Sequence, residues 1–244
     1  MSKELSNKRI VLHEQTLSSI HAAGNPASGM QSSGPVYLLS PANSAGRRAK
    51  MLLNPAADFE LARRLRKTGI SLGEAFSFMS SLYFRGKLAY TATFSQGRAA
   101  PAGTLVITSS RGLLPPETLV KLEELEEISN ERILADNPKY RDPLERDLRL
   151  LSHAMGSQCR AVLLGSIATK KYIPLLLEIL ADRLVVPKAF VGMGNMQRGA
   201  LLLRCAREKY ELEYVSVNEV VSRRSKHPEK SSKDGPKPVS YGLR

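Results

Sequence analysis

The sequence predicts an α/β fold in which a small, mainly parallel sheet of about five strands is flanked by helices. Three observations lead to this expectation. Short apolar runs recur along the chain, amphipathic stretches separate them, and 244 residues are enough for one sizeable hydrophobic core. Strands that alternate with helices in this way are joined by right-handed crossovers, and the sheet they form is parallel.

The expected strands are nearly all apolar, which is typical of strands that helices cover on both faces. They lie at 36–40 (VYLLS), 104–108 (TLVIT), 161–165 (AVLLG), 184–187 (LVVP) and 213–217 (EYVSV).

The amphipathic stretches predict the helices between these strands. Ser71 and Glu74 have the spacing of a capping box, which marks the start of one of them. The helices are expected at 44–67 with a break near Asn54-Pro55, at 71–83, 116–128, 143–155, 173–180 and 196–209.

The ends of the chain differ in composition from its centre. Residues 1–34 are polar without periodicity, and residues 222–244 combine Lys and Arg with Pro, Ser and Gly. We therefore expect a flexible N-terminal arm, one α/β domain over 35–221 and a disordered basic C-terminal tail. No apolar run of about 18 residues and no secretory signal is present, so a cytoplasmic protein without membrane contact is expected.

The cysteine and histidine content indicates no metal and no other cofactor. Two cysteines and four scattered histidines give neither a disulfide framework nor metal-ligand spacing. Cys159 and Cys205 lie among apolar residues and are interpreted as packed thiols rather than nucleophiles.

The charge is high and unevenly distributed. The net charge is +13, and residues 46–98 hold ten basic and three acidic side chains, whereas residues 99–221 hold sixteen of each. Such a surface attracts a polyanion, and the alternative is a basic protein that is merely well solvated. The candidate nucleic-acid-binding residues are Arg47, Arg48, Arg63, Arg64, Lys67, Arg85 and Lys87.

The aromatic side chains near Arg85 and Lys87 leave two readings open. Tyr83 could stack on a base while the two cations hold a phosphate, or Tyr83, Phe84 and Tyr90 could pack in the core. We favour the core for Phe84. For the basic helix at Arg63, the alternative to DNA binding is a solvated helix face.

Polar residues follow several of the expected strands, and carboxyl ends of parallel strands are where ligands bind in open sheets. Their hydroxyls, amides and guanidinium groups suit a phosphate or the polar edge of a base. The candidate substrate-binding residues are Ser40, Asn43, Ser109, Ser110, Ser166, Asn195, Gln197 and Arg198. Gln197 occupies the third glycine position of a GxGxxG motif and no GxxxxGK[ST] motif occurs, so these loops match no known phosphate fingerprint.

Acid–base candidates lie near the expected helix start at residue 143. Asp142 and Glu145 could act as a general base, or their charges could simply favour the helix N-terminus. No Ser/His/Asp arrangement supports a hydrolase triad.

Three segments resemble, in order, motifs of the YaaA-like superfamily, which includes a domain of archaeosine synthase. Residues 38–42 (LLSPA) resemble its opening strand and turn, although Asn43 stands where a lysine commonly follows. Residues 108–115 (TSSRGLLP) resemble its turn after the second strand, and residues 194–199 (GNMQRG) resemble the late loop that enters the final helix. The resemblance spans about residues 36–207.

Members of this superfamily bind DNA under oxidative stress or handle 7-deazaguanine bases in nucleic acid. The resemblance, with the size and charge of the chain, implies an enzyme that hydrates the nitrile of a 7-deazaguanine base in DNA to an amide-type product. We expect Glu145 or Asp142 as general base and Arg111 or Lys171 as donor to the nitrile nitrogen. The implied partners are DNA and other enzymes of a DNA-modification pathway.

Two alternatives stay open. One is a non-catalytic, stress-protective DNA-binding protein, and the other is an enzyme that binds free nucleotides or cleaves N-glycosides.

Overall fold

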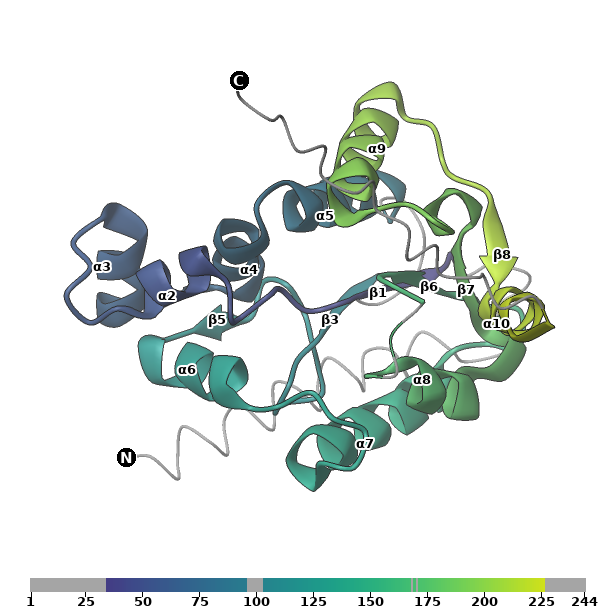
Figure 1. Ribbon diagram of the computed structural model, residues 1–244, viewed down its shortest axis with the longest axis horizontal. Coiled ribbons are helices and arrows are strands. Elements are labelled where there is room, and N and C mark those ends of the chain that lie inside the picture. Colours follow the sequence, from purple (N-terminus) through teal and green to yellow (C-terminus); the bar gives the residue numbers. More distant parts are fainter. Residues whose placement is uncertain (1–33, 96–102, 168, 170, 227–244) are drawn as a thin grey trace, which may run out of the picture.

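A sheet of six strands lies between two layers of helices in the computed structural model (Figure 1). The structure describes residues 34–95, 103–167, 169 and 171–226. The strand order is β4-β3-β1-β6-β7-β8. The four inner strands are parallel, and β4 and β8 run antiparallel to them at the two edges. The strands are β1 (Val36–Leu39), β3 (Thr104–Ile107), β4 (Leu113–Leu114), β6 (Ala161–Leu164), β7 (Leu184–Pro187) and β8 (Tyr214–Ser216).

Strand β1 is the centre of the sheet and the place where its strand order reverses. It pairs with β3 on one side, where Leu38 is in register with Leu105, and with β6 on the other, where Leu38 is in register with Leu163. The connections that leave β1 and β6 therefore diverge in opposite directions. Such a switch point opens a crevice at the carboxyl ends of the two strands, which is where ligands bind in sheets of this type.

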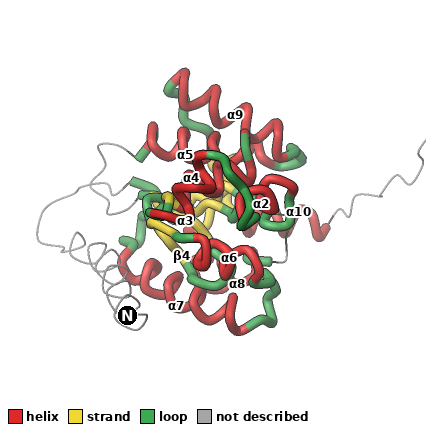
Figure 2. Tube along the Cα trace, turned by 90° about the vertical axis from the view of Figure 1, so that its left-hand side faces the viewer, coloured by secondary structure: helices red, strands yellow, loops and turns green. Residues whose placement is uncertain are grey.

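The helices form one layer on each face of the sheet. Helices α4, α5 and α9 cover one face, and α6, α7 and α8 cover the other (Figure 1). In the side view the strands lie between these two layers (Figure 2). The helices are α2 (Arg47–Leu53), α3 (Glu60–Lys67), α4 (Leu72–Ser80), α5 (Leu82–Phe94), α6 (Leu122–Asn130), α7 (Pro138–Ala154), α8 (Ile173–Leu180), α9 (Asn195–Glu208) and α10 (Val217–Lys226). A second, two-stranded sheet joins β2 (Ile70–Ser71) to β5 (Leu119–Val120).

Helices α5 and α9 pack against each other at two glycines. A Cβ atom on Gly86 would lie 2.7 Å from the backbone oxygen of Gly199, and one on Gly199 would lie 2.8 Å from the Cα of Tyr83. Neither position has room for a side chain, so the two backbones approach closely. Lys87 follows Gly86 on α5, and Arg198 precedes Gly199 on α9. The contact between the helices therefore brings these two cations to the same side of the sheet.

The predicted α/β class and the five predicted strands are confirmed, and the structure adds β4 as a sixth. Ser71 caps α4, since its hydroxyl accepts a hydrogen bond from the Glu74 amide at 3.1 Å. The break at Asn54 is also confirmed, because α2 ends at Leu53. The burial of Cys159 and Cys205 agrees with their interpretation as packed thiols.

Two predicted helix starts are wrong. The helix expected from residue 116 begins at Leu122, because residues 119–120 pair with β2 instead. The helix expected from residue 143 begins at Pro138, where the side chain of Asn137 caps it by accepting a hydrogen bond from the Lys139 amide at 3.2 Å.

Helix α10 runs to Lys226, beyond the position 221 at which the domain was expected to end. The predicted N-terminal arm, except for Gly34, and the tail from residue 227 lie outside the described residues. Within the part of the chain that the structure describes, no helix is long and apolar enough to cross a membrane.

Candidate active-site cleft

A cleft of about 710 Å³ lies at the switch point, beside the carboxyl ends of β1 and β6. Its volume is in the range typical of sites for small molecules or single nucleotides. Three segments line most of it: the turn after β1, the loop after β6 and the segment after α6. The lining residues are 40–45, Ser80, Tyr83, 129–134, Ser166, Thr169, Lys171, Tyr172 and Asn195.

The turn after β1 is held in place by one local hydrogen bond and two that join it to distant segments. The Ser40 amide donates to the Leu164 carbonyl at 3.3 Å, which extends the pairing of β1 with β6 by one residue. The side chain of Asn43 accepts from the Ala45 amide at 3.1 Å, and the Asn43 amide donates to the Ser80 hydroxyl at 3.1 Å. The turn is thereby fixed to both the sheet and the end of α4.

The ammonium-bearing side chain of Lys87 lies beneath this turn. Lys87 is only 1% exposed, and its Nζ donates to the Ser40 hydroxyl at 2.7 Å and to the Ser40 carbonyl at 2.9 Å. Nζ also lies 4.2 Å from the ring centroid of Tyr83 and 5.2 Å from that of Phe84. Burial, and then the positive charge of Arg198, lower the pKa of Lys87 to about 7. This amine therefore exchanges a proton near neutral pH.

Arg198 brings a second buried cation to the same region. It is 7% exposed, donates from one terminal nitrogen to the Phe190 carbonyl at 2.8 Å, and lies 5.2 Å from the centroid of the Phe190 ring. Its Nε and the hydroxyl of Tyr83 are both buried and make no hydrogen bond of normal geometry with the described residues, although the Arg198 guanidinium lies close enough to the phenol to act on its pKa. Burial raises the pKa of Tyr83 to about 12, so its hydroxyl stays protonated and is available as a donor.

Tyr172 closes the side of the cleft that faces β6. Its hydroxyl donates to the Ser166 carbonyl and accepts from the Ser166 amide, both at 3.1 Å. A Cβ atom on Gly165 would lie 2.9 Å from both the Tyr172 hydroxyl and the Ser40 Cβ, so Tyr172 and Ser40 meet over a glycine. Burial raises the pKa of Tyr172.

Ser40, Tyr83 and Tyr172 line the cleft, and Lys87 and Arg198 are buried behind them. We call these five side chains the cleft floor. Its groups offer a hydroxyl beside an amine that titrates near neutral pH, with positive charge and a phenol close by. No carboxylate is among the groups that shift the pKa of Lys87. The arrangement suits proton transfer to or from a hydroxyl, and stabilisation of negative charge that develops next to it.

Several residues predicted from the loops do come together. Ser40, Asn43, Ser166 and Asn195 line the cleft, as does Lys171, which was predicted as a donor. Arg198 belongs to the cleft floor rather than to the surface loop that precedes it.

Other predicted binding residues serve the local structure. Gln197 caps α9, where its side-chain oxygen accepts from the Gly194 amide at 3.1 Å. Ser109 is buried and donates to the Ile128 carbonyl, and neither Ser109 nor Ser110 lines the cleft.

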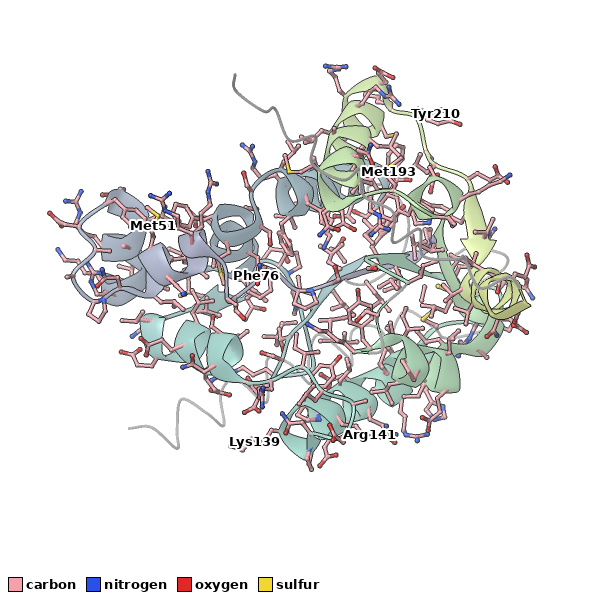
Figure 3. All side chains as sticks on the ribbon, in the orientation of Figure 1. Met51, Phe76, Lys139, Arg141, Met193 and Tyr210 are labelled. Atoms are coloured by element: carbon pink, nitrogen blue, oxygen red, sulfur yellow. The ribbon has the colours of Figure 1, made fainter. Side chains whose placement is uncertain are left out.

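The predicted acid–base residues lie outside the cleft. Asp142 and Glu145 are within α7 rather than at its start, and Glu145 accepts hydrogen bonds from Arg149 at 2.6 and 3.2 Å. The hydrogen bond from Arg149 lowers the pKa of Glu145, which makes this carboxylate a weaker base. Arg141, which pairs with the same carboxylate at 3.2 Å, lies on the periphery of α7 (Figure 3).

Arg111, the other predicted donor, is also directed elsewhere. Its guanidinium pairs with Glu124 at 3.2 Å and with Glu127, both on α6. The turn that carries it is fixed against α7, since the Leu113 amide donates to the buried carboxylate of Asp147 at 2.9 Å.

The prediction of Lys87 as a DNA-binding residue is wrong, because its ammonium is buried under Ser40 and cannot reach a phosphate backbone. Phe84 is fully buried, as favoured above, and Tyr83 packs against Phe190. Arg85 is exposed.

The remaining predicted cations lie on α2 and α3. Arg47 and Arg48 are exposed at the start of α2, directly after the turn that lines the cleft. Arg63 pairs with Asp58 and Glu60, and Arg64 forms two hydrogen bonds with Glu74, so the positive charge of these two side chains is locally balanced. Lys67 is exposed at the end of α3.

Sequence reasoning missed Tyr172 and the segment 129–134. Tyr172 directly follows the predicted Lys171, so its position in the same loop was an available signal. Residues 129–134 follow a helix rather than a strand, and the rule about carboxyl ends of strands therefore gave no reason to choose them.

In the part of the chain that the structure describes, no group of three or more His, Cys, Asp or Glu side chains could hold a metal ion. Comparison of the chain with known protein families, with curated proteins and with solved structures found no match.

Proposed function

We propose that this protein is an enzyme that hydrates the nitrile of a 7-deazaguanine base in DNA to a carboxamide. The observation that supports an enzyme is the buried hydrogen bond between Lys87 and Ser40 at the base of an open polar cleft. A lysine whose pKa is lowered to about 7 by burial, next to a cleft at a switch point, is typical of a functional site.

The chemistry of the cleft floor suits addition of an O–H group across a polar multiple bond. The oxygen must lose a proton as it bonds to carbon, and the nitrogen must gain one. Lys87 can accept a proton near neutral pH, and the Tyr83 hydroxyl stays protonated and can act as a donor. Arg198 supplies positive charge where the nitrogen becomes negative.

The polar lining suits a purine-like base. Asn43, Ser166 and Asn195 provide the amide and hydroxyl groups that pair with base edges, and Tyr83 and Tyr172 provide aromatic surface. The choice of a 7-deazaguanine nitrile rests on the sequence resemblance described above, since the lining would also accept other polar bases.

The basic residues outside the cleft suit a nucleic-acid backbone. Arg47 and Arg48 are exposed beside the cleft, and Lys171 is exposed within its lining. A base in a duplex would have to leave the stack to enter the cleft, and contacts of these cations with the flanking phosphates would then hold the strand.

The test is mass spectrometry of nucleosides from DNA that contains the nitrile-bearing base, digested after incubation with the purified protein. We expect the modified nucleoside to gain one water, and Lys87→Met to abolish the gain. Lys188→Met is the matched control, because Lys188 is exposed, pairs with Glu213 and does not line the cleft. An unchanged nucleoside in DNA that the protein demonstrably binds would refute the proposal.

That last outcome would favour the alternative, a DNA-binding protein without catalysis. The exposed cations at the start of α2 support this second candidate. It predicts binding that weakens steeply with salt and does not depend on Lys87.

A further inference from the structure

Ser40 lies at the end of the central strand β1, directly over the buried amine of Lys87. It follows the last residue of β1, lines the cleft, and is fixed through its amide to β6. Both of its oxygens accept hydrogen bonds from the same Nζ, at 2.7 and 2.9 Å. The hydroxyl is thus held on the path between the amine and the cleft.

The distance between the two side chains is that of a nucleophile and its base. Activated serine nucleophiles lie within hydrogen-bond reach of a base, and lysine serves as that base in some enzymes. For Lys87 to accept a proton it must be uncharged, and its surroundings favour that form. Burial, and then the positive charge of Arg198, together lower the pKa of Lys87 to about 7.

The charged and titratable groups that face Lys87 come from three elements. Tyr83 lies on the same helix with its ring 4.2 Å from Nζ, Arg198 comes from α9, and Tyr172, from the loop after β6, lies beside Ser40 on the cleft side. Burial raises the pKa of both tyrosines, so they stay neutral while Lys87 titrates. The proton that moves near neutral pH is therefore the proton of Lys87.

A structural role alone does not account for the rest of the cleft floor. Lys87 Nζ donates to both Ser40 oxygens and one terminal nitrogen of Arg198 donates to the Phe190 carbonyl, so each of these two buried groups has an acceptor of its own. The Nε of Arg198 and the hydroxyl of Tyr83 are nine-tenths buried and make no hydrogen bond of normal geometry with the described residues. Donors placed in this way beside a nucleophile stabilise the negative charge that forms when it attacks.

We propose that Ser40 is a nucleophile that forms a covalent intermediate with an electrophilic carbon of the substrate, with Lys87 as its general base. The Ser40 oxygen bonds to the carbon, its proton passes to Lys87, and an electron pair of the carbon–heteroatom multiple bond moves to the heteroatom. Lys87 then returns a proton to that heteroatom.

For the nitrile of the proposed function, on which this substrate assignment rests, the intermediate is an imidate ester of Ser40. A water molecule adds to its carbon and gives a proton to the imidate nitrogen through Lys87. The bond from carbon to the Ser40 oxygen then breaks, the serine regains a proton, and a carboxamide leaves. One water is consumed, and no oxidant or reductant is needed.

The test uses the full-length protein and a fluorophosphonate, which reacts with activated serines with loss of fluoride. Intact-mass measurement followed by peptide mapping should find one adduct, on Ser40. The labelling rate should rise about tenfold between pH 6 and pH 8, because the neutral fraction of an amine with a pKa near 7 rises from about a tenth to about nine-tenths. A rate that is flat over this range, or an adduct elsewhere, would overturn the proposal.

Three variants separate chemistry from folding. Ser40→Ala should give no adduct, and Lys87→Met should slow labelling at least about 100-fold and remove its pH dependence. Ser77→Ala is the control for serine loss, since Ser77 lies on α4 outside the cleft. The thermal unfolding of each variant shows whether it is folded, and the pH profile of the unaltered protein tests the proposal without any substitution.

The labelling and the nucleoside assay can fail independently. Labelling of Ser40 without a gain of water on the nucleoside would support Ser40 as the nucleophile and refute the proposed substrate. A gain of water that persists in Ser40→Ala would support the proposed substrate and refute the role of Ser40 as nucleophile.

Discussion

The buried amine of Lys87 should make the stability of the protein depend on pH, and the sign follows from its pKa. Burial, followed by Arg198, lowers this pKa from the ordinary value of 10.5 to about 7 in the folded state. Between these two values the unfolded chain keeps a proton that the folded chain has lost. The free energy of unfolding therefore rises with pH across this window, and the protein loses this stability as the pH falls toward 7.

The size of the effect can be worked out from the same two values. From pH 7 to pH 9 the unfolded lysine remains charged, while the charged fraction of the folded one falls from about a half to about a hundredth. The corresponding gain in the free energy of unfolding is on the order of 2 kcal/mol. Because Lys87 is buried, solvent screening does not reduce this figure as it would for a surface charge.

Urea denaturation at pH 7, 8 and 9 measures this quantity. Other groups also titrate in this range, so the informative value is the difference between the unaltered protein and Lys87→Met, which has no such proton to lose. Lys188→Met, which removes an exposed lysine, should follow the unaltered protein. If the free energies of unfolding of Lys87→Met and of the unaltered protein change in parallel from pH 7 to pH 9, the pKa of Lys87 is not lowered. Lys87 could then not serve as the general base for Ser40.

Three further predictions concern the frame of the cleft and its approach. Gly86→Ala should lower the free energy of unfolding by about 1–2 kcal/mol. The new Cβ would lie 2.7 Å from the backbone oxygen of Gly199, and this clash outweighs the gain in helix propensity of about 1 kcal/mol. An equal or higher stability in chemical denaturation would contradict this prediction. Gly112→Ala should lower the free energy of unfolding by more than about 2 kcal/mol, since φ is +63° and the new Cβ would clash with the buried carboxylate of Asp147 on α7. Thermal and chemical unfolding measure this loss, and a change within error would count against the turn geometry. Replacing both Arg47 and Arg48 by glutamine should reduce the slope of log affinity for DNA against log salt by about 2, measured by fluorescence anisotropy, whereas an unchanged slope would exclude phosphate contacts there.

The fold was predictable where burial alone decides the local structure. Fully apolar runs such as 161–164 mark strands that helices cover on both faces, and their order gave the parallel sheet. The two-residue strands β4 and β5 were not predictable, because so short a segment has no periodicity and pairs only when a distant partner lies beside it. The start of α6 was misjudged for the same reason.

The candidate site was predictable to the extent that it follows strand ends. Ser40, Ser166 and Lys171 were found because each follows a parallel strand closely. Lys87 was predicted to bind nucleic acid at the surface, because it lies in a segment that combines basic and aromatic residues and a lysine is rarely fully buried. Its burial depends on the close contact of α5 with α9, which joins segments that are far apart in the sequence and leaves no local pattern.

The position of β1 at the centre of the sheet also has a consequence for how the protein is made. β1 is the earliest of the described strands, yet its partners Leu105 and Leu163 are synthesised much later than Leu38. Until β6 has left the ribosome, the four buried residues of β1 have at most one of their two neighbours. Pairing over such separations is slow, and an apolar strand that waits for it is exposed to aggregation. We therefore expect refolding on the millisecond-to-second scale, with the cleft, which needs both β1 and β6, among the last features to form.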